Sequence, residues 1–281
     1  MNDGFFKIIG ADFITIQNFV MNESASNTVT AAATNTMMEW GVALLYATTT
    51  NGAQNIIIQN NTITLNRIYQ NTFGIYSNST HAAGTATTSA TATTTAGGNS
   101  GLKIYGNTIS NVNMGIVVVG PTAVADANTG IEIGGAGLGN TITNFGTTGT
   151  FSAYPNVSGT VNGILVRNSN GFVISNNTVT SSVGGVTVGT LNGIQIPASS
   201  ATPTATFTNN INSNSISLQS GLIGGAMNGI NYPSGSASTT SVLNVNSNNF
   251  HTFGHTVAGT AAITRHYLAN YFGTISSQLR I

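Results

Sequence analysis

The chain has 281 residues, only 4% of them are charged, and six basic and six acidic side chains give a net charge of zero. Hydrophobic residues make up 40% of the chain, which excludes a disordered protein and supplies enough apolar material for a sizeable core. The few cations are widely scattered, so the chain lacks the clustered basic surface that binding to nucleic-acid phosphates requires. We therefore expect no nucleic-acid partner.

The sequence contains no recognisable targeting or membrane-spanning segment. Its first residues, MNDGFFKIIGADF, have neither the basic start nor the apolar run of a secretory signal. No stretch approaches the ~18 consecutive apolar residues of a membrane span. Cysteine is absent, which fits an oxidising and a reducing compartment equally well. We expect no membrane span, and either an intracellular protein or a segment whose signal lies upstream.

Two short patterns alternate along the whole chain. Unit A reads apolar-x-apolar-x-x-Asn-x-apolar, as in IIIQNNTI at residues 56–63, and unit B is a small residue followed by a short apolar strand. The asparagines of unit A are Asn61, Asn107, Asn140, Asn177, Asn214 and Asn248. The copies of unit B begin at Trp40, Phe73, Met114, Asn162, Asn192, Asn228 and Ala261.

The spacing of these units predicts a solenoid. Successive unit A asparagines are 46, 33, 37, 37 and 34 residues apart, a regularity that marks a repeat architecture. Each repeat contains two short stretches with the two-residue alternation of a β-strand, bounded by Gly, Asn and Ser, and no helical period. We therefore expect an all-β chain in which about seven coils, with two strands each, stack in parallel as one domain over residues 1–281.

The stacking gives each repeated residue a structural role. Alternate side chains of a strand point inward, so Ile58, Ile104 and Ile174 should form an apolar column, whereas Ile57 should face outward. The asparagine lies where the chain turns, tolerates a left-handed backbone, and is expected to hydrogen-bond its equivalent one coil away as a ladder. The glycine of unit B should serve a tight bend with close backbone approach.

Segments rich in Ser, Thr, Ala and Pro interrupt the repeats. The longest, residues 77–100, is expected to be a mobile loop that projects from the coil, because its composition cannot form a packed core. Shorter stretches at residues 124–128, 147–160, 197–206 and 234–240 are interpreted as surface loops. None of them is expected to mark a domain boundary.

The coil pattern resembles the right-handed parallel β-helix proteins of the pectin lyase-like class. More narrowly, TMMEWGVALLY, GAQNIIIQNNTITLNR and FGIYSNST are similar to repeat regions of very large secreted proteins of Bacteroidetes, which commonly end in a type IX secretion sorting domain. The resemblance covers roughly residues 8–267. It implies a single-stranded right-handed parallel β-helix, a secreted or cell-surface location, and flanking β-helix coils in a longer parent chain as partners. The signal and sorting tail of that group are not in this sequence.

Because this class includes polysaccharide lyases and glycosidases, the carboxylates were considered as a catalytic site. A glycosidase needs two or three carboxylates on one face, and a lyase needs a basic residue and usually an Asp-rich Ca²⁺ site. The chain has six carboxylates, and only Asp126 and Glu132 are close enough for a single coil to place together. With Arg167 they form the candidate site of an enzyme, although for Arg167 we favour a surface ion pair with Glu132.

Other chemical motifs are weaker. The C-terminal His251, His255 and His266 lack the spacing of a metal site and are interpreted as polar residues of a terminal coil. The insertion GGAGLG at residues 134–139 matches neither a dinucleotide loop nor a P-loop. Trp40 is interpreted as a core or turn residue rather than as part of a sugar-stacking platform. No cofactor or metal is expected.

These observations favour a non-catalytic scaffold or adhesin-like segment that binds glycans or a protein partner weakly through its polar, uncharged surface. The alternative is a carbohydrate-active lyase or glycosidase. Neither end of the chain reads as a charged or helical cap, so we also expect association that depends on concentration.

Overall fold

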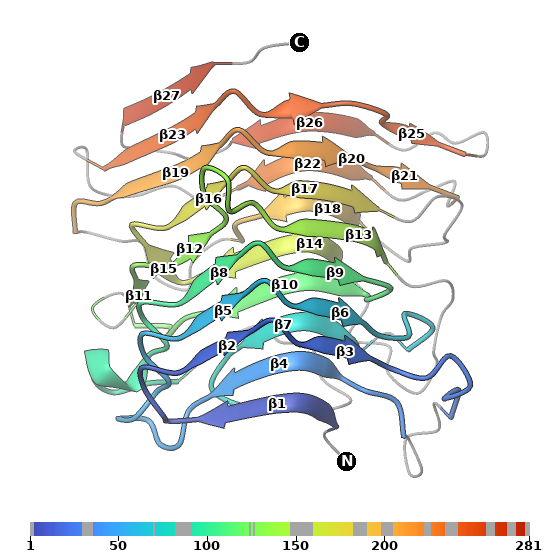
Figure 1. The fold of residues 1–281 in the computed structure, drawn as a ribbon. Coiled ribbons are helices and arrows are strands. Elements are labelled where there is room, and N and C mark those ends of the chain that lie inside the picture. The colour runs from blue at the N-terminus through green and yellow to red at the C-terminus, as the bar shows by residue number, and fades with distance from the viewer. Residues whose placement is uncertain are drawn as a thin grey trace.

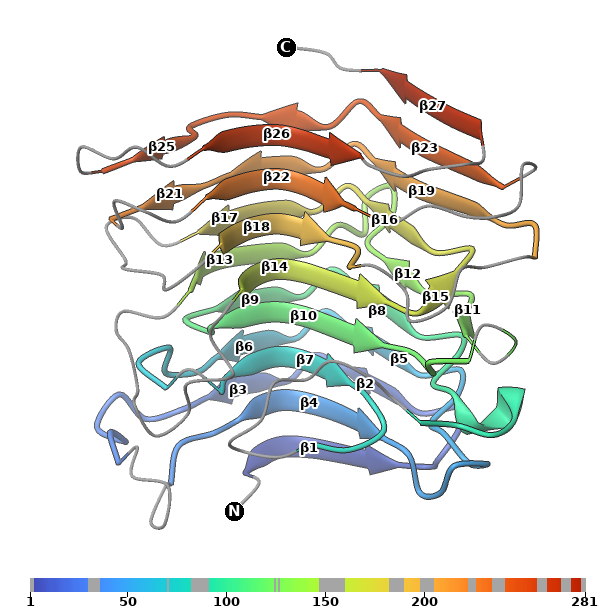
Figure 2. The same ribbon diagram turned by 180° about the vertical axis from the view of Figure 1, so that it is seen from behind.

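The computed structural model describes residues 3–29, 36–69, 71–81, 91–123, 125, 127–146, 160–181, 190–197, 205–221, 226–233, 241–256, 262–268 and 274–278. The described chain is a stack of coils whose strands form three long parallel sheets (Figure 1). In Figure 1 the nearer strands run from left to right while the chain climbs from N to C, and from behind, in Figure 2, the other strands do the same. The coil is therefore right-handed, as predicted.

Sheet 1 contains the unit B strands, β1 (Gly4–Ile9), β4 (Trp40–Leu45), β7 (Phe73–Ser77), β10 (Met114–Val119), β14 (Thr160–Arg167), β18 (Thr190–Gln195), β22 (Met227–Tyr232) and β26 (Ile263–Leu268). Sheet 2 contains β2 (Thr15–Gln17), β5 (Ile57–Gln59), β8 (Lys103–Tyr105), β12 (Glu132–Ile133), β16 (Val173–Ser175), β19 (Thr208–Asn212), β23 (Val242–Asn246) and β27 (Thr274–Gln278). Sheet 3 contains β3 (Val20–Asn22), β6 (Thr62–Thr64), β9 (Thr108–Ser110), β13 (Thr141–Phe145), β17 (Thr178–Ser181), β20 (Ser215–Ser217) and β24 (Asn249–Phe250).

Short elements complete the coils. Two small sheets pair β11 (Asn128–Thr129) with β15 (Ser169–Asn170), and β21 (Gln219–Ser220) with β25 (Gly254–His255). A single 3₁₀ turn, η1 (Thr95–Gly97), is the one helical element in the described residues. We number the coils from the N-terminus, so that β1–β3 form the first coil, β4–β6 the second and β26–β27 the eighth. Among the described residues, no helix has the length and apolar character needed to cross a membrane.

Each of the first seven coils has three main strands, so the prediction of two strands per coil is wrong. Unit A divides into a sheet 2 strand and a sheet 3 strand, because the chain bends just before the ladder asparagine. Except at Gly139 in the coil with the glycine insertion, the residue before the ladder asparagine has a left-handed backbone, with φ of 55° at Asn60 and 60° at Asn176. Short polar residues and glycine accept this conformation at little cost. The left-handed residue is therefore the neighbour of the ladder asparagine and not the ladder asparagine itself.

The interior of the coil is a column of stacked aliphatic side chains. Ile58 pairs with Ile16 on one side and Ile104 on the other, and Ile174 continues the column. All four are buried, whereas Ile57 is only partly buried. This confirms the predicted alternation, in which one residue of each pair points into the core.

The unit B glycines form a second column, where the backbone of sheet 1 approaches sheet 3. A Cβ on Gly115 would lie 2.4 Å from the carbonyl oxygen of Gly163 and 2.7 Å from Cγ2 of Ile142. Gly41, Gly74 and Gly193 meet an isoleucine and a glycine carbonyl in the same way. The repeated Gly of unit B is therefore required for close packing, as predicted.

The described parts of the insertion at residues 77–100 pack against the coil, so the expectation of a projecting loop is wrong for them. Asn99 is buried, its Oδ1 accepts a hydrogen bond from the Ala53 backbone N–H (2.7 Å), and its Nδ2 donates to Ser77 Oγ (2.9 Å). The backbone N–H of Gly52 donates to the carbonyl of Ala96 (3.0 Å). Residues 82–90 lie outside the described residues, as do most of the four shorter predicted loops.

Candidate functional site

The predicted asparagine ladder is present and buried. In coils 2 to 6 the backbone N–H and Nδ2 of the asparagine both donate to Oδ1 of the asparagine one coil further on, at 3.0 Å from Asn61 to Asn107. Nδ2 also donates to a backbone carbonyl of the preceding coil, as from Asn61 to Ile16 (3.0 Å). The same bonds join Asn107, Asn140, Asn177, Asn214 and Asn248. The ladder satisfies buried turn amides, which is a structural role.

A second cluster of buried side chains lies outside the coil, on the outer face of sheet 1. We call it the outer cluster. Every residue of β4, β7 and β10 is buried, so these strands are covered on both faces. The outer cluster comprises Met37, Trp40, Ala43, Leu45, Tyr46, Tyr69, Phe73, Tyr76, Ala92, Met114, Val117, Val119 and Leu165. Trp40, Phe73 and Met114 align in register, as the sequence predicted, and Trp40 is a buried residue.

The outer cluster encloses a carboxylate and an imidazole. Oε2 of Glu39 lies 3.6 Å from Nε2 of His81, and both side chains are buried. Glu39 accepts hydrogen bonds from the Asp3 backbone N–H (3.2 Å) and from the Tyr69 hydroxyl (3.4 Å). Nε2 of His81 also lies 3.0 Å from Nδ2 of Asn71.

Three aromatic rings surround the imidazole edge-on. The ring centroids of Trp40, Phe73 and Tyr76 lie 4.9, 5.6 and 4.8 Å from that of His81. Burial raises the pKa of Glu39 to about 7 and lowers the pKa of His81 to about 4, the latter also because Lys7 is nearby. Between these values both groups are mostly neutral, so their contact is not an ion pair over most of that range.

A buried Glu and His within contact distance are groups that acid–base catalysis uses. The pKa of Glu39 lies in the range expected of a catalytic acid. However, Glu39 has 0% of its surface exposed, so a substrate does not reach the carboxylate in this conformation. The arrangement is a titratable pair inside a packed cluster rather than an open active site.

Of the predicted catalytic residues, Glu132 and Arg167 are described, and they lie in different sheets. Glu132 lies in β12 of sheet 2, where Oε1 is 3.3 Å from Nζ of Lys103 and Oε2 accepts a hydrogen bond from the Tyr105 hydroxyl. The Tyr105 hydrogen bond, assisted by Lys103, lowers the pKa of Glu132. Arg167 ends β14 in sheet 1, and its predicted ion pair with Glu132 is wrong because Lys103 takes that position. Asp126 lies outside the described residues.

Two further carboxylates serve the coil. Glu23 accepts hydrogen bonds from the backbone N–H groups of Met38 (2.8 Å) and Asn66 (2.9 Å), which ties three segments together. Its burial raises the pKa of Glu23. Asp12 accepts from the backbone N–H of Gln54 (2.7 Å) one coil further on. Among the described residues, no three His, Asp or Glu side chains gather as metal ligands.

The terminal histidines are partly described. His251 is exposed and contacts Ser215 Oγ (3.0 Å), and His255 lies in β25. The side chains of His266 and Arg265 lie outside the described residues. The glycine insertion at residues 134–139 is a turn between β12 and β13, with Leu138 exposed.

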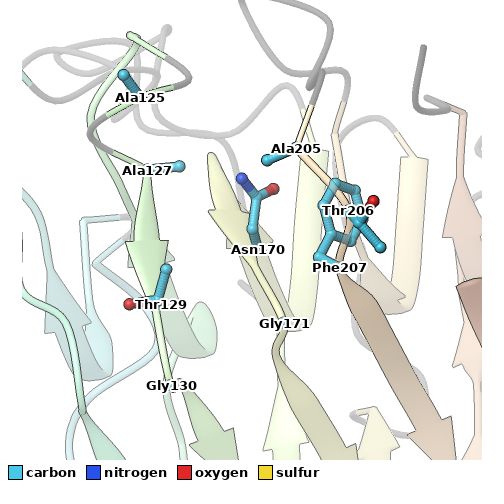
Figure 3. A pocket seen from close by; sticks show the side chains of 9 residues that line it. All are labelled: Ala125, Ala127, Thr129, Gly130, Asn170, Gly171, Ala205, Thr206 and Phe207. Atoms are coloured by element: carbon cyan, nitrogen blue, oxygen red, sulfur yellow. The ribbon is translucent and has the colours of Figure 1, made fainter. Parts of the chain in front are cut away.

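An open groove of about 640 Å³ lies where the coil enters sheet 2 (Figure 3). It is lined by Ala125, Ala127, Thr129, Gly130, Asn170, Gly171, Ala205, Thr206 and Phe207, none of which is charged. Figure 3 shows Asn170 projecting between Ala127 and Ala205, beside the ring of Phe207. The amide of Asn170 has no hydrogen-bond partner within the part of the chain that the structure describes.

The groove opens because the backbone pairing is interrupted there. On one side β15 pairs with β11. On the other side Gly171 and Phe172 donate their backbone N–H groups to Oδ1 of Asn209 (2.8 and 3.2 Å), so a side chain replaces the backbone acceptor. The carbonyl of Phe207 instead accepts from Val242 in the next coil (2.9 Å).

Sequence reasoning missed the Glu39 and His81 pair. A signal was available in unit B, because WGVALL and MGIVVV are apolar at every position except Gly, which is typical of strands buried on both faces. NGIQI, by contrast, alternates and leaves its outer face polar.

No family model, curated protein or solved structure matches the chain.

Proposed function

We propose that this chain is a non-catalytic β-helical scaffold, an adhesin-like segment of a secreted or cell-surface bacterial protein. The observation that carries the proposal is that its described carboxylates are engaged in structural contacts. Glu23, Asp12 and Glu132 are bonded to neighbouring coils, and Glu39 is enclosed in the outer cluster. Depolymerisation of a polysaccharide requires ionisable groups held together in an accessible cleft. The described residues leave little material for such a site.

We further propose that the groove at Asn170 is where weak glycan contact occurs. Its amide offers both a donor and an acceptor to sugar hydroxyls, and the ring of Phe207 offers an apolar face. The uncharged lining favours a neutral sugar. The resemblance to pectin lyase-like repeats and to secreted Bacteroidetes proteins agrees with this function and is itself part of the proposal.

Flanking coils of a longer parent chain are the proposed partners at the C-terminal end. The eighth coil ends the described stack, and its strands β26 and β27 lie at the edges of sheets 1 and 2 among the described residues. A coil that follows in the parent chain would pair with these edges, as β26 pairs with β22 and β27 pairs with β23.

The test is the release of reducing or unsaturated ends from a panel of acidic and neutral polysaccharides. We expect no release by the chain. Robust turnover that is abolished by Glu132→Gln, Arg167→Ala or Asp126→Asn would overturn the scaffold in favour of a lyase or glycosidase. Glycan binding is measured separately on an array, with Asn170→Ala expected to weaken it and the exposed Asn249→Ala as the matched control.

A further inference from the structure

A second groove lies beside the turn that follows β6. Its volume is about 390 Å³, within the range of pockets that hold small ligands. It lies between the loop after β3 and the turns after β6 and β9, and its lining includes Arg67. Figures 1 and 2 show β6 and β15 on opposite sides of the stack, so this groove is separate from the one at Asn170.

Arg67 is a partly buried cation without a carboxylate partner among the described residues. Its Nη1 donates to the backbone carbonyl of Gly146 (3.1 Å), a bond that reaches from the second coil to the fourth. The other N–H groups of the guanidinium have no acceptor in the described part of the chain. Burial lowers the pKa of Arg67, because no nearby anion compensates for the lost hydration.

The hydrogen bond to Gly146 fixes the guanidinium but does not satisfy it. A brace between coils needs only this one bond, whereas an arginine has five N–H donors in a planar fork. A fixed guanidinium with open donors is suited to a carboxylate, which accepts two parallel hydrogen bonds from such a fork. Arg67 therefore gives the groove a preformed anion site.

Glu23 also lines the groove, but the wall of the groove holds its carboxylate. Oε1 accepts hydrogen bonds from Nδ2 of Asn27 (2.9 Å) and from the backbone N–H of Met38 (2.8 Å), and Oε2 accepts one from the backbone N–H of Asn66 (2.9 Å). Glu23 forms no ion pair with Arg67. The described lining thus has one cation, and Glu23 would repel a second negative charge on a ligand. A carboxylate fits this balance better than a doubly charged phosphate.

The rest of the lining is suited to the end of a peptide chain. Ala25, Leu65 and Ile68 are aliphatic, and none of the described lining residues is an aromatic ring that could stack on a sugar. Oδ1 of Asn111 accepts a hydrogen bond from Nδ2 of Asn144, so Nδ2 of Asn111 is left to donate to a ligand carbonyl.

We propose that this groove binds the C-terminal residue of a peptide, with the carboxylate on Arg67 and an aliphatic side chain on Ile68. The amide of Asn111 binds the preceding peptide carbonyl. Capture of a C-terminal carboxylate is a recurring mode of peptide recognition. The partner is thus a protein with an accessible C-terminus, and its binding is independent of glycan contact at Asn170.

The first experiment uses fluorescence polarisation at low ionic strength, with a dye-labelled pentapeptide of glycine and alanine that ends in leucine. We expect weak binding that is lost when the C-terminus is amidated. Arg67→Gln should weaken binding roughly 10- to 100-fold, because it removes charge-assisted hydrogen bonds. Lys103→Gln removes an equal charge on sheet 2, where Lys103 pairs with Glu132, and should bind as the parent does. No binding by the parent, equal binding of the amidated peptide, or equal loss in both variants would overturn the proposal.

A second variant covers the case in which Arg67 is needed for folding, which circular dichroism would reveal. Thr28 is exposed at the mouth of the groove, so Thr28→Tyr should block the peptide without altering the guanidinium. Thr178→Tyr, at an exposed threonine of sheet 3, is the matched control and should bind normally. Unweakened binding by Thr28→Tyr would place the peptide elsewhere and refute the site.

Competition identifies the source of the carboxylate. The unlabelled peptide should displace the labelled one at a lower concentration than an oligomer of galacturonic acid or inorganic phosphate does. Stronger displacement by either competitor would assign the groove to a sugar carboxylate or to a phosphate and overturn the peptide. Glycan binding at Asn170 should be the same in Arg67→Gln as in the parent, so failure here leaves the proposed function intact.

Discussion

Replacing Glu39 with glutamine should make the protein more stable than the parent chain at neutral and alkaline pH, by a margin that grows as the pH rises. The pKa of Glu39 is about 7 in the fold and 4.5 in its ordinary state, because burial disfavours the charged carboxylate. The folded parent therefore binds a proton more tightly than the unfolded chain, and loses stability as the pH rises from about 4.5 to beyond 7. Glutamine does not ionise and escapes this loss.

The size of this stability difference follows from the shift in the pKa of Glu39. A difference of about 2.5 pKa units corresponds to about 3 kcal/mol in the free energy of unfolding. We expect the stability of Glu39→Gln minus that of the parent to rise by this amount between pH 4 and pH 8. Glutamine also changes the hydrogen bonds from Asp3 and Tyr69, but that contribution does not vary with pH in this range.

The assay is denaturant unfolding followed by tryptophan emission at several pH values. Trp40 is the only tryptophan of the chain, and it lies in the outer cluster against His81, so its emission reports this region directly. His81→Gln is the matched control. Burial lowers the pKa of the His81 imidazole, so the parent gains stability as the pH rises from about 4 to 6.5. The stability of His81→Gln relative to the parent should therefore grow as the pH falls.

The two variants must therefore have pH slopes of opposite sign. If the stability of Glu39→Gln minus that of the parent did not change with pH, the carboxylate of Glu39 would ionise normally in the fold. Slopes reversed in both variants would mean that Glu39 and His81 form a charged pair, and would refute the argument from burial.

The remaining predictions concern the repeats. Asn177→Ala should cost about 2–4 kcal/mol in unfolding free energy, because it leaves buried donors of the previous coil unpaired. Asn176→Gly should be nearly neutral at its left-handed position, and equal costs for the two variants would contradict the ladder. Ile58→Asp should prevent folding, as judged by circular dichroism, while Ile57→Thr is tolerated; equal damage would contradict the alternation. Gly115→Ala should cost about 1–3 kcal/mol, measured by chemical denaturation, and an unaffected variant would show that β10 can move outward. Removing Ca²⁺ with EDTA should leave the melting temperature unchanged, and a lowered value would reveal a calcium site.

The repeated features could be predicted from the sequence because the same environment recurs in every coil. Asn61 and Asn107 meet each other whatever the length of the loop between them, and so do Ile58 and Ile104. The position of a repeat in the sequence is then enough to name its contacts. The three-sheet outline of the coil was missed because the bend depends on the residue before the ladder asparagine, which is Asn, Gly or Ser in different coils.

The outer cluster could not be predicted in this way because its members occur once. Glu39 and His81 are 42 positions apart, and their contact depends on how two irregular segments fold back over sheet 1. The groove depends in turn on Asn209 replacing a backbone acceptor in a single coil. Repeats predict neither event, since each is a departure from the repeat.

The stacking of coils also determines how the molecule would unfold under mechanical tension. Each coil holds mainly its two neighbours, so tension applied at the ends would unwind coils in sequence rather than all at once. A released coil of 33 to 46 residues lengthens the chain by roughly 110–160 Å at full extension. The outer cluster packs against β4, β7 and β10 from outside. Under tension these coils would unfold together, whereas the coils near the C-terminus would unfold one at a time. We therefore expect the C-terminal coils to unfold under tension before the coils that contain β4, β7 and β10.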